Sequence, residues 1–433
     1  MHPNKIYIGD NLPILQNIPD KSINLILTDP PYMTGQNFGD YRDIFIDGVQ
    51  FVDNEIDTII KGLCIGKSKQ QKQQIRGFIN FMYPRLLEAR RVLTDNGSIF
   101  LMCDYNAHHI IRVLLDYVFG EKNFLRALAW SGVNNTISPS KNKFQKTHDV
   151  IYHFSKEQNK NAFYHKYKDY SKASVERYIS PTGTLERKQL PKKQQLLIKY
   201  YEKKYYKGIP QKVRCDDRGI YSLSGCSQPV HKGYYYKLGM GEETPRDGYM
   251  LKEHVMRGLI KKGRIVITKG QTPRVKSYMN DGALYGDTIK HIKSVGNTES
   301  IGYATEKPYQ LFHHLIAHTT KKDDVVLDMF AGSGITAVVC ATYEDKPAHY
   351  IESTNFEPRR FIIIDMNPIL PRNILKKYTI MKGTTSTNIF GNKQTTQDLN
   401  HDKAKALIDS MPMEEVKKQV EEKLNAYIPS RYP

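Results

Sequence analysis

An α/β fold built around a mostly parallel sheet is predicted from two stretches of the chain, residues 1–155 and 291–382. In both stretches, short apolar runs with the length of buried strands alternate with longer segments of helical periodicity. A glycine turn follows the apolar run 325–327 and leads into a further apolar segment, as expected of a strand–turn–helix unit. Alternation of this kind is typical of layered α/β proteins, in which helices cover a parallel sheet.

The elements of the first stretch follow from periodicity and turn residues. Apolar residues at 78, 82, 86, 89 and 93 repeat at helical spacing and leave a basic opposite face. Residues 66–77 consist mostly of Lys and Gln, which predicts a solvated loop or the start of a helix. The expected order is strands at 5–9 and 23–28, a helix at 78–93, a strand at 98–104, a helix at 107–119, and strands at 124–130 and 149–155.

The second stretch repeats the alternation after an interruption. Residues 156–290 are rich in tyrosine, lysine and glycine and show no compact alternation. We therefore expect 1–155 and 291–382 to form two halves of one core, 156–290 an insertion, and 383–433 a linker with a charged helix at 412–428. The expected elements after the insertion are a helix at 308–320, a strand at 324–330, a helix through Cys340 and a strand at 360–365.

Composition restricts the class of protein. The net charge of +19 indicates a polyanionic partner, with nucleic acid as the first candidate and an anionic membrane surface as the second. No apolar run approaches the ~20 residues that cross a bilayer, and the first residues lack the layout of a signal peptide. The five cysteines are scattered, and Cys215 and Cys226 have no second pair, so no disulfide framework or metal site is expected. His108 and His109 are expected to be structural, and the chain to be cytoplasmic.

The stretch "DMFAGSGIT", residues 328–336, is the strongest glycine motif. Its glycines would allow a sharp turn and a close approach to a ligand at the carboxyl end of a strand. No lysine follows the second glycine, which excludes a Walker A loop, whereas Gly332, Gly334 and Ala337 satisfy G-x-G-x-x-A. The acidic residue that this dinucleotide fingerprint requires about 20 positions later is replaced by Asp365, farther along. By itself the loop is compatible with cofactor binding or with a structural turn.

A second motif, "TDPPY", ends the apolar run 23–28 abruptly. Prolines cannot continue a strand ladder, so Asp29 and Tyr32 are expected just beyond the strand. One interpretation is a simple strand end, with the tyrosine packed as a cap. The other is a functional clamp at the edge of the sheet.

Together, "DPPY" and "FAGSG" resemble the motifs of the amino-methyltransferases of DNA, which use S-adenosylmethionine. The tetrapeptide comes before the glycine loop, as in the β class of that family. Further stretches of similarity are "GDNLPIL", "NGSIFLMCD", "THDVIYHFSK" and "IGYATEKPYQLFHHLI". Within the class, "GIYSLSGC", "KKGRIVITKGQTPRVKSYM" and "RRFIIIDM" are similar to modification subunits of Type III restriction systems. The resemblance covers roughly residues 5–368 and implies a Rossmann-like methyltransferase fold with a target-recognition insertion and a helical C-terminal tail.

The resemblance implies a role for each motif residue. Asp29 and the Pro30 carbonyl would accept hydrogen bonds from an exocyclic amino group, and Tyr32 would stack on a flipped base. Pro30 and Pro31 would keep this clamp rigid. Lys307 matches the family pattern, whereas Glu306 stands where glutamine is commoner. The implied cofactor-binding residues are Asp10, Thr305, Lys307, Asp328, Phe330, Ala331, Gly332, Ser333, Gly334 and Asp365.

We expect transfer of a methyl group to the N6 of adenine in a short sequence of double-stranded DNA. The basic aromatic insertion 156–290 is expected to recognise that target sequence. A cognate restriction subunit and a homodimer joined by the charged helix are the further partners considered, and no membrane is expected. Several alternatives stay open: cytosine-N4 methylation, an RNA or protein substrate, a non-catalytic DNA-binding protein with a vestigial fold, and a dehydrogenase that binds NAD.

Overall fold

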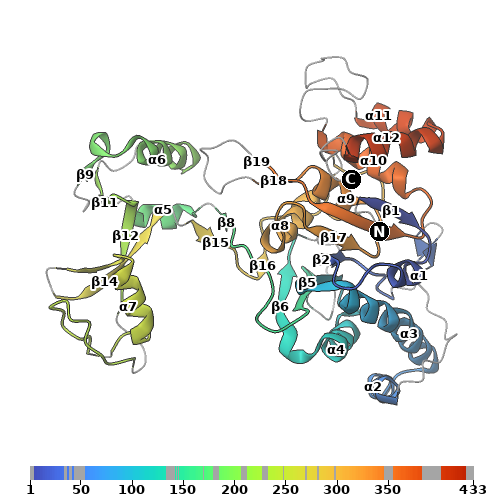
Figure 1. Ribbon diagram of the computed structural model, residues 1–433, viewed down its shortest axis with the longest axis horizontal. Coiled ribbons are helices and arrows are strands. Elements are labelled where there is room, and N and C mark those ends of the chain that lie inside the picture. Colours follow the sequence, from blue (N-terminus) through green and yellow to red (C-terminus); the bar gives the residue numbers. More distant parts are fainter. Residues whose placement is uncertain are drawn as a thin grey trace. The chain divides into compact units, whose positions relative to one another are not determined.

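The computed structural model places the chain in two compact units (Figure 1). The core unit lies within Met1–His165, Gly286–Asp345 and Asn355–Pro433, and the inserted unit lies within Lys166–Tyr285. The structure describes residues 4–33, 37–38, 41–42, 54–132, 142, 144, 146–168, 170–178, 185–205, 212–226, 233–246, 248–268, 271–279, 282–296, 299–345, 355–382 and 401–425. The linker expected after residue 382 lies outside the described residues.

An eight-stranded sheet forms the centre of the core unit, in the order β1–β20–β17–β2–β5–β7–β6–β16. Neighbouring strands are parallel except at β7, which is antiparallel to both β5 and β6. The α/β class with a mostly parallel sheet is therefore confirmed. The strands are β1 (Lys5–Ile8), β2 (Ile23–Thr28), β5 (Leu93–Cys103), β6 (Phe124–Trp130), β7 (Asp149–Ser155), β16 (Thr288–Ile289), β17 (Val325–Asp328) and β20 (Arg360–Asp365).

The two halves of the core meet between β2 and β17, where Leu25 pairs with Val326 and Ile26 with Leu327. Because β1, β20, β17 and β2 are neighbours and parallel, their carboxyl ends lie along one edge of the sheet. The segments that follow these strands are the ones that carry the predicted motifs.

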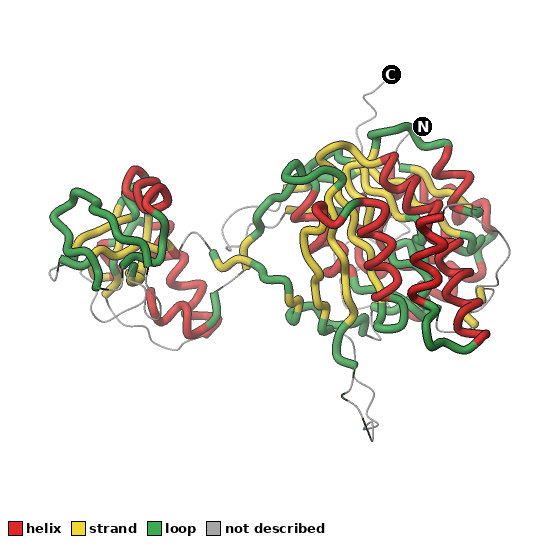
Figure 2. Tube along the Cα trace, turned by 90° about the horizontal axis from the view of Figure 1, so that it is seen from below, coloured by secondary structure: helices red, strands yellow, loops and turns green. Residues whose placement is uncertain are grey.

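Helices flank both faces of this sheet (Figure 2). Ile26 packs into a cluster with α3 and α4, whereas Leu25 and Leu27 pack into a second cluster with α8, α9, α10 and α12. The alternation of side chains along a strand thus produces one core on each face. The helices are α1 (Asn11–Gln16), α2 (Asn54–Leu63), α3 (Lys69–Val92), α4 (His108–Phe119), α8 (Tyr309–Thr319), α9 (Ile335–Ala341), α10 (Leu370–Lys382), α11 (His401–Ser410) and α12 (Met413–Asn425). The short elements are β3 (Asn37–Phe38), β4 (Tyr41–Arg42), β18 (Glu344–Asp345), β19 (Asn355–Phe356) and the 3-10 turn Glu121–Asn123.

The start of helix α3 and the environment of helix α12 differ from the simplest interpretation of the sequence. Helix α3 begins at Lys69, because Ser68 and Gln71 form a capping box in which each side chain accepts from the other residue's backbone N–H. The charged helix α12 is not exposed on all sides, because Val416, Val420 and Leu424 are buried in the second cluster. This apolar stripe is therefore covered within the chain.

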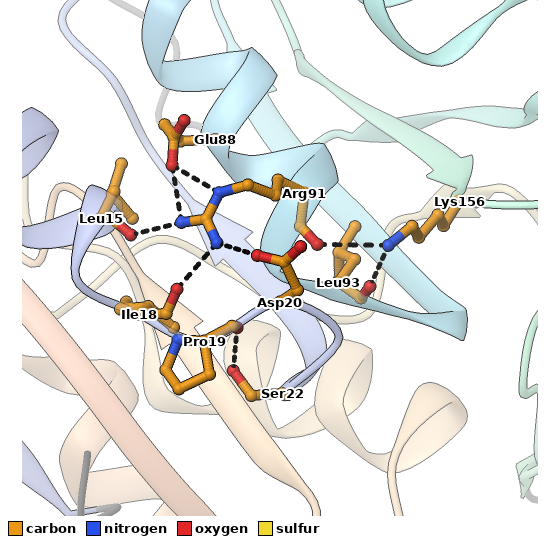
Figure 3. A network of polar contacts seen from close by, with 9 residues as sticks. All are labelled: Leu15, Ile18, Pro19, Asp20, Ser22, Glu88, Arg91, Leu93 and Lys156. Carbon is orange, nitrogen blue, oxygen red and sulfur yellow. Dashed lines mark hydrogen bonds and ion pairs between the residues drawn. The ribbon is translucent and has the colours of Figure 1, made fainter.

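A polar network fixes the amino ends of β2 and β5, at the edge opposite to the motifs (Figure 3). The guanidinium of Arg91 donates to the carbonyl oxygens of Leu15 and Ile18, at 2.9 Å each, and to the carboxylates of Asp20 and Glu88. One side chain thus satisfies a carbonyl in the last turn of α1 and another in the α1–β2 loop, and ties both to the end of α3. Lys156 joins the network by donating to the backbone carbonyls of Arg91 and Leu93.

Replacing Arg91 with lysine should lower the free energy of unfolding by about 1–3 kcal/mol, because an ammonium cannot reach four acceptors in the geometry of a guanidinium. Urea unfolding of the full chain measures this loss. Arg90, the exposed neighbour in the same helix, provides the matched control Arg90→Lys, which we expect to change little. Equal losses in the two variants would contradict the role assigned to the network.

The inserted unit is built on a four-stranded antiparallel sheet in the order β11–β12–β14–β13. Two small hydrophobic clusters pack against it. Its elements are β8 (Tyr167–Lys168), α5 (Lys172–Tyr178), β9 (Leu185–Glu186), the 3-10 turn Arg187–Gln189, α6 (Lys192–Tyr205), β10 (Lys212–Val213), β11 (Cys215–Asp216), β12 (Gly219–Gly225), α7 (Glu253–Lys261), β13 (Ile265–Ile267), β14 (Pro273–Tyr278) and β15 (Ala283–Leu284). Across both units, none of the described helices is long and apolar enough to cross a bilayer.

Candidate active site

A cavity of about 280 Å3 opens at the carboxyl ends of β2, β17 and β20. Every predicted site residue except Gly334 lines this cavity, although the first and the last of them, Asp10 and Asp365, lie 355 positions apart in the chain. The lining residues are Gly9, Asp10, Asn11, Asp29, Pro30, Pro31, Tyr32, Phe81, Arg85, Tyr303, Thr305, Lys307, Phe312, Asp328, Met329, Phe330, Ala331, Gly332, Ser333, Ile335, Asp365, Met366, Asn367 and Pro368.

The carboxylate of Asp29 is held from two sides. The Lys307 ammonium donates a hydrogen bond to Oδ2 of Asp29, and the Tyr32 hydroxyl donates one to Oδ1. The side chains of Asp29 and Lys307 are only 15% and 10% exposed, so this ion pair is largely shielded from water. Burial raises the pKa of Asp29, and the nearby charge of Lys307 opposes that rise. The resemblance had implied that Lys307 binds the cofactor; the structure places its ammonium on the clamp carboxylate.

Asp328 anchors the glycine loop from within. Its Oδ1 accepts from the Thr28 hydroxyl and the Phe330 N–H, both at 3.1 Å, and its Oδ2 accepts from Thr336 at 2.5 Å. The residue is 2% exposed, and this burial raises the pKa of its carboxyl to about 7. Because these bonds join β2, β17 and α9, Asp328 holds the start of the loop in register with the clamp strand.

Gly334 supports the loop from behind. It precedes α9 with a φ of +76°, and a Cβ at this position would overlap Cγ1 of Ile374 in α10. The fold therefore requires glycine here twice over, once for the backbone conformation and once for the contact between loop and helix. Gly332, with a φ of +51°, faces the Tyr303 ring at the cavity wall.

Replacing Gly334 with alanine should lower the free energy of unfolding by about 2–5 kcal/mol, through left-handed strain and overpacking. Gly66 provides the matched control: its φ is +70° but no atom lies within 4 Å of where its Cβ would be. Gly66→Ala should therefore show only the backbone cost of about 1–2 kcal/mol. Chemical denaturation compares the two, and equal losses would exclude the collision with Ile374.

Asp365 ends β20 beside the glycine loop, as expected from the sequence. It accepts from the Gly332 N–H at 2.7 Å and from the Asn367 N–H at 2.8 Å, one bond to each oxygen. Burial raises the pKa of this carboxyl as well. Since a carboxylate oxygen can accept two hydrogen bonds, both oxygens keep capacity for a ligand hydroxyl.

Arg85 is the main site residue that sequence reasoning missed. Its guanidinium donates to Asp10 at 2.6 Å and to the Asn11 amide oxygen at 2.5 Å, and it stacks 3.7 Å from the Phe81 ring centroid. Asn11 in turn donates to the Met329 carbonyl at 2.7 Å. In the sequence, Arg85 was one of several basic residues on the polar face of a helix, and no spacing pairs it with Asp10.

The loop before α8 is secured by a second buried ion pair. Glu306 accepts from Lys377 at 2.5 Å and from the Ile301 N–H at 3.0 Å, and Lys377 also donates to the Glu299 carbonyl. The side chains of Glu306 and Lys377 are 3% and 0% exposed. This pair fixes the position of Lys307 from behind. Tyr303 of the same loop lines the cavity, and burial raises the pKa of its hydroxyl to about 12.

A family model described as DNA methylase, of the N6/N4 methyltransferase type, matches residues 23–376. The chain is 26% identical over 394 residues to the Mod subunit of the Type III restriction-modification enzyme StyLTI of Salmonella typhimurium, covering 86% of this chain and 54% of that protein. It is 24% identical over 361 residues to the EcoP15I Mod subunit of Escherichia coli, covering 76% of this chain and 54% of that protein. The chain thus spans a little over half the length of these relatives.

Solved structures with a detectable likeness include the PvuII DNA methyltransferase (cytosine-N4-specific), at 12% identity and a TM-score of 0.39, covering 98% of this chain and 94% of that one. Another is the M1.HpyAVI–SAM complex, at 12% identity and a TM-score of 0.33, covering 86% and 98%. The family match spans both halves of the core and both motifs of the cavity. The resemblance seen in the sequence is therefore confirmed, and the chain belongs to the N6/N4 family of DNA methylases.

Proposed function

We propose that this chain is a site-specific DNA methyltransferase that transfers a methyl group from S-adenosylmethionine to the N6 amino group of adenine. The observation that carries the proposal is the meeting of Asp29 and the glycine loop in one cavity, at the carboxyl ends of adjacent strands. Each motif alone has a structural explanation. Their location in one cavity, beside a buried and ion-paired carboxylate, favours a single functional site formed by the two motifs.

The residues around the glycine loop fit S-adenosylmethionine. Asp365 keeps acceptor capacity for ribose hydroxyls, and Gly332, which lines the cavity in a left-handed conformation, leaves the loop backbone without a side chain there. Asp10 uses Oδ1 for Arg85 and for its helix cap, while no described residue bonds its Oδ2. When bound, the cofactor supplies an electrophilic methyl group on a sulfonium.

The clamp prepares the amino group to receive that methyl. Asp29 accepts one N–H of the amine and the Pro30 carbonyl accepts the other, which draws the nitrogen lone pair out of conjugation with the ring. Tyr32 lines the cavity beside Asp29 and offers a stacking face to a base rotated out of the duplex. The charge of Lys307 favours the ionised form of the Asp29 carboxylate, which is the form that accepts hydrogen bonds, in this largely buried site.

Adenine is preferred over cytosine as the target because the first clamp residue is an aspartate, whereas serine is commoner in cytosine-N4 enzymes. Cytosine-N4 methylation uses the same clamp and is the second candidate. A vestigial, non-catalytic fold is disfavoured because all clamp residues and every residue of the glycine loop except Gly334 line a formed cavity. Isothermal titration with S-adenosylmethionine separates that alternative, because a vestigial site would give no binding.

The deciding experiment is transfer of labelled methyl to mixed-sequence duplex DNA, followed by nucleoside digestion and mass spectrometry, with Asp29→Ala alongside. N6-methyladenine that disappears in the variant supports the substrate, the reaction and the clamp together. N4-methylcytosine would overturn the choice of base. Binding of S-adenosylmethionine without transfer to DNA would overturn the substrate.

The similar Mod subunits belong to Type III restriction-modification enzymes, and on that basis we propose a cognate restriction subunit as a further partner. The homodimer considered from the charged helix loses its simplest support, since the apolar stripe of α12 is covered within the chain. Light scattering during size-exclusion chromatography measures the oligomeric state, and a mass near 50.0 kDa would exclude the homodimer.

A further inference from the structure

The inserted unit carries most of the chain's excess positive charge. Residues 166–285 contain 26 lysines and arginines against 11 aspartates and glutamates, an excess of +15 within the whole chain's +19. A surplus of this size confined to one compact unit indicates contact with a polyanion. The fold of the unit shows where that contact can be made.

The register of the four-stranded sheet separates its side chains onto two faces. Tyr221 pairs with Tyr278 and Leu223 with Lys276, while Gly225 pairs with Arg274, so these side chains share one face. Arg264 joins them at the edge, since its carbonyl accepts from the Lys276 N–H at 2.7 Å. We call this the basic face: Tyr221, Leu223, Arg264, Arg274, Lys276 and Tyr278.

The opposite face is already covered. Ile220 packs in one cluster with residues of α5 and α6, and Ile265 packs in the other with Met256 of α7. An antiparallel sheet with one covered face usually exposes polar side chains on the other. Here that face combines cationic with aromatic side chains, and all the residues of the basic face except Tyr278 are partly exposed.

Contacts within the basic face hold the cations over aromatic rings. The Lys276 ammonium lies 4.8 Å from the Tyr221 ring centroid, and the Arg264 guanidinium lies 5.2 Å from that of Tyr278. Asp216 accepts from Lys276 and from the Tyr278 hydroxyl, at 2.8 Å each, which fixes the centre of the arrangement. The Asp216 carboxylate thus offsets the charge of Lys276, whereas the neutral ring of Tyr278 holds the Arg264 guanidinium without adding a counter-charge.

Arg274 has the least internal compensation on this face. Its guanidinium lies against Gly225, where a Cβ would be 3.3 Å from Nη1, so the absence of a side chain at Gly225 leaves room for it. Among the described residues, none forms an ion pair with Arg274. A partly exposed guanidinium in a fixed position without a counter-ion is suited to a phosphate.

We propose that the basic face binds the sugar–phosphate backbone of duplex DNA, with Arg274 and Arg264 each neutralising a phosphate. This inference rests on the proposed function for its choice of polyanion, and adds the surface that holds the substrate. The Tyr278 ring holds Arg264 and the Tyr221 ring holds Lys276, whereas Arg274 lies against Gly225. The face supplies affinity and orientation, which are the roles of phosphate contacts.

The test is fluorescence anisotropy of a labelled mixed-sequence duplex titrated with the full chain at several salt concentrations. Each phosphate contact contributes about 0.9 to the slope of log K against log salt, so Arg274→Gln and Arg264→Gln should each lower the slope by about one and weaken binding severalfold at low salt. Arg274→Lys keeps the charge and should restore the slope. Arg257 on α7, exposed beside the covered face, provides the matched control Arg257→Gln, which should bind like the wild type.

Three outcomes would overturn the inference: wild-type slopes in Arg274→Gln and Arg264→Gln, an equal loss in Arg257→Gln, or no binding of duplex DNA by the wild-type chain. Far-ultraviolet circular dichroism of each variant shows that a loss of binding does not come from unfolding. Failure of the proposed function is distinguishable, because it appears as DNA binding without methyl transfer. In that case the salt slopes still decide the role of the basic face.

Discussion

Replacing Asp29 with asparagine is expected to lower kcat for methyl transfer by about 10²–10³-fold, the usual loss on weakening one preorganised electrostatic contact. The amide oxygen can still accept a hydrogen bond, but a neutral acceptor holds the amino group less strongly than a carboxylate. The size and shape of the side chain are unchanged, so the loss reports the charge. Single-turnover transfer of labelled methyl measures it.

The control for this result is binding of S-adenosylmethionine, since Asp29 belongs to the base side of the cavity. We expect its dissociation constant in Asp29→Asn to stay within about threefold of the wild type, as for a residue that acts on the reacting group. A loss of cofactor binding that matched the loss of rate would contradict the clamp role and would place Asp29 on the cofactor side.

Replacing Lys307 with methionine is expected to move the acidic limb of the pH–rate profile to higher pH. Burial already raises the pKa of Asp29, and Lys307 is the cation that opposes this rise. The Tyr32 hydroxyl also contacts the Asp29 carboxylate, and the negative charges of Asp104 and Asp149 raise the pKa of Asp29 further. Without the ammonium the pKa rises more, so at a given pH less of Asp29 is ionised and able to accept. Activity is present above this pKa and is lost as the pH falls through it.

We expect kcat/KM of Lys307→Met to fall by about 10–100-fold at the acidic end of the profile and to recover in part as the pH rises, because Asp29 without the ammonium ionises only at higher pH. Lys307→Arg keeps the charge and should keep the position of the acidic limb, even if its rate is lower. A profile in Lys307→Met that is lower by the same factor at every pH would contradict the electrostatic role and leave only a structural one.

The sequence predicted the layout of the core because its signals are local. The strands at 23–28 and 360–365 are mostly apolar runs, as expected for strands covered on both faces, and they appear as β2 and β20 with the expected limits. The start of α3 was harder to predict, because its first two turns are lysine and glutamine. The signal that fixes it is Ser68 followed three residues later by Gln71, a capping box that a hydrophobic pattern does not reveal.

The candidate site was predictable as far as its motifs, but not its partners. Resemblance brought the clamp and the glycine loop together, whereas the pairing of Lys307 with Asp29 joins residues 278 positions apart and follows only from the packing of β2 beside the loop before α8. Arg85 is a similar case, because its partner Asp10 lies on another element 75 residues away. Pairings of this kind depend on the tertiary fold, which no periodicity specifies.

The buried ion pair of Glu306 and Lys377 restricts which segments of this chain can be exchanged by recombination. The two residues lie 71 positions apart, and each would be left as an unpaired buried charge if the other were exchanged alone, at a cost of about 3–5 kcal/mol. A recombination event between them that brought in a neutral glutamine at 306 would leave Lys377 without its counter-charge. Viable hybrids with relatives should therefore receive both residues from the same parent, so that the segment from 306 to 377 is passed on as one block.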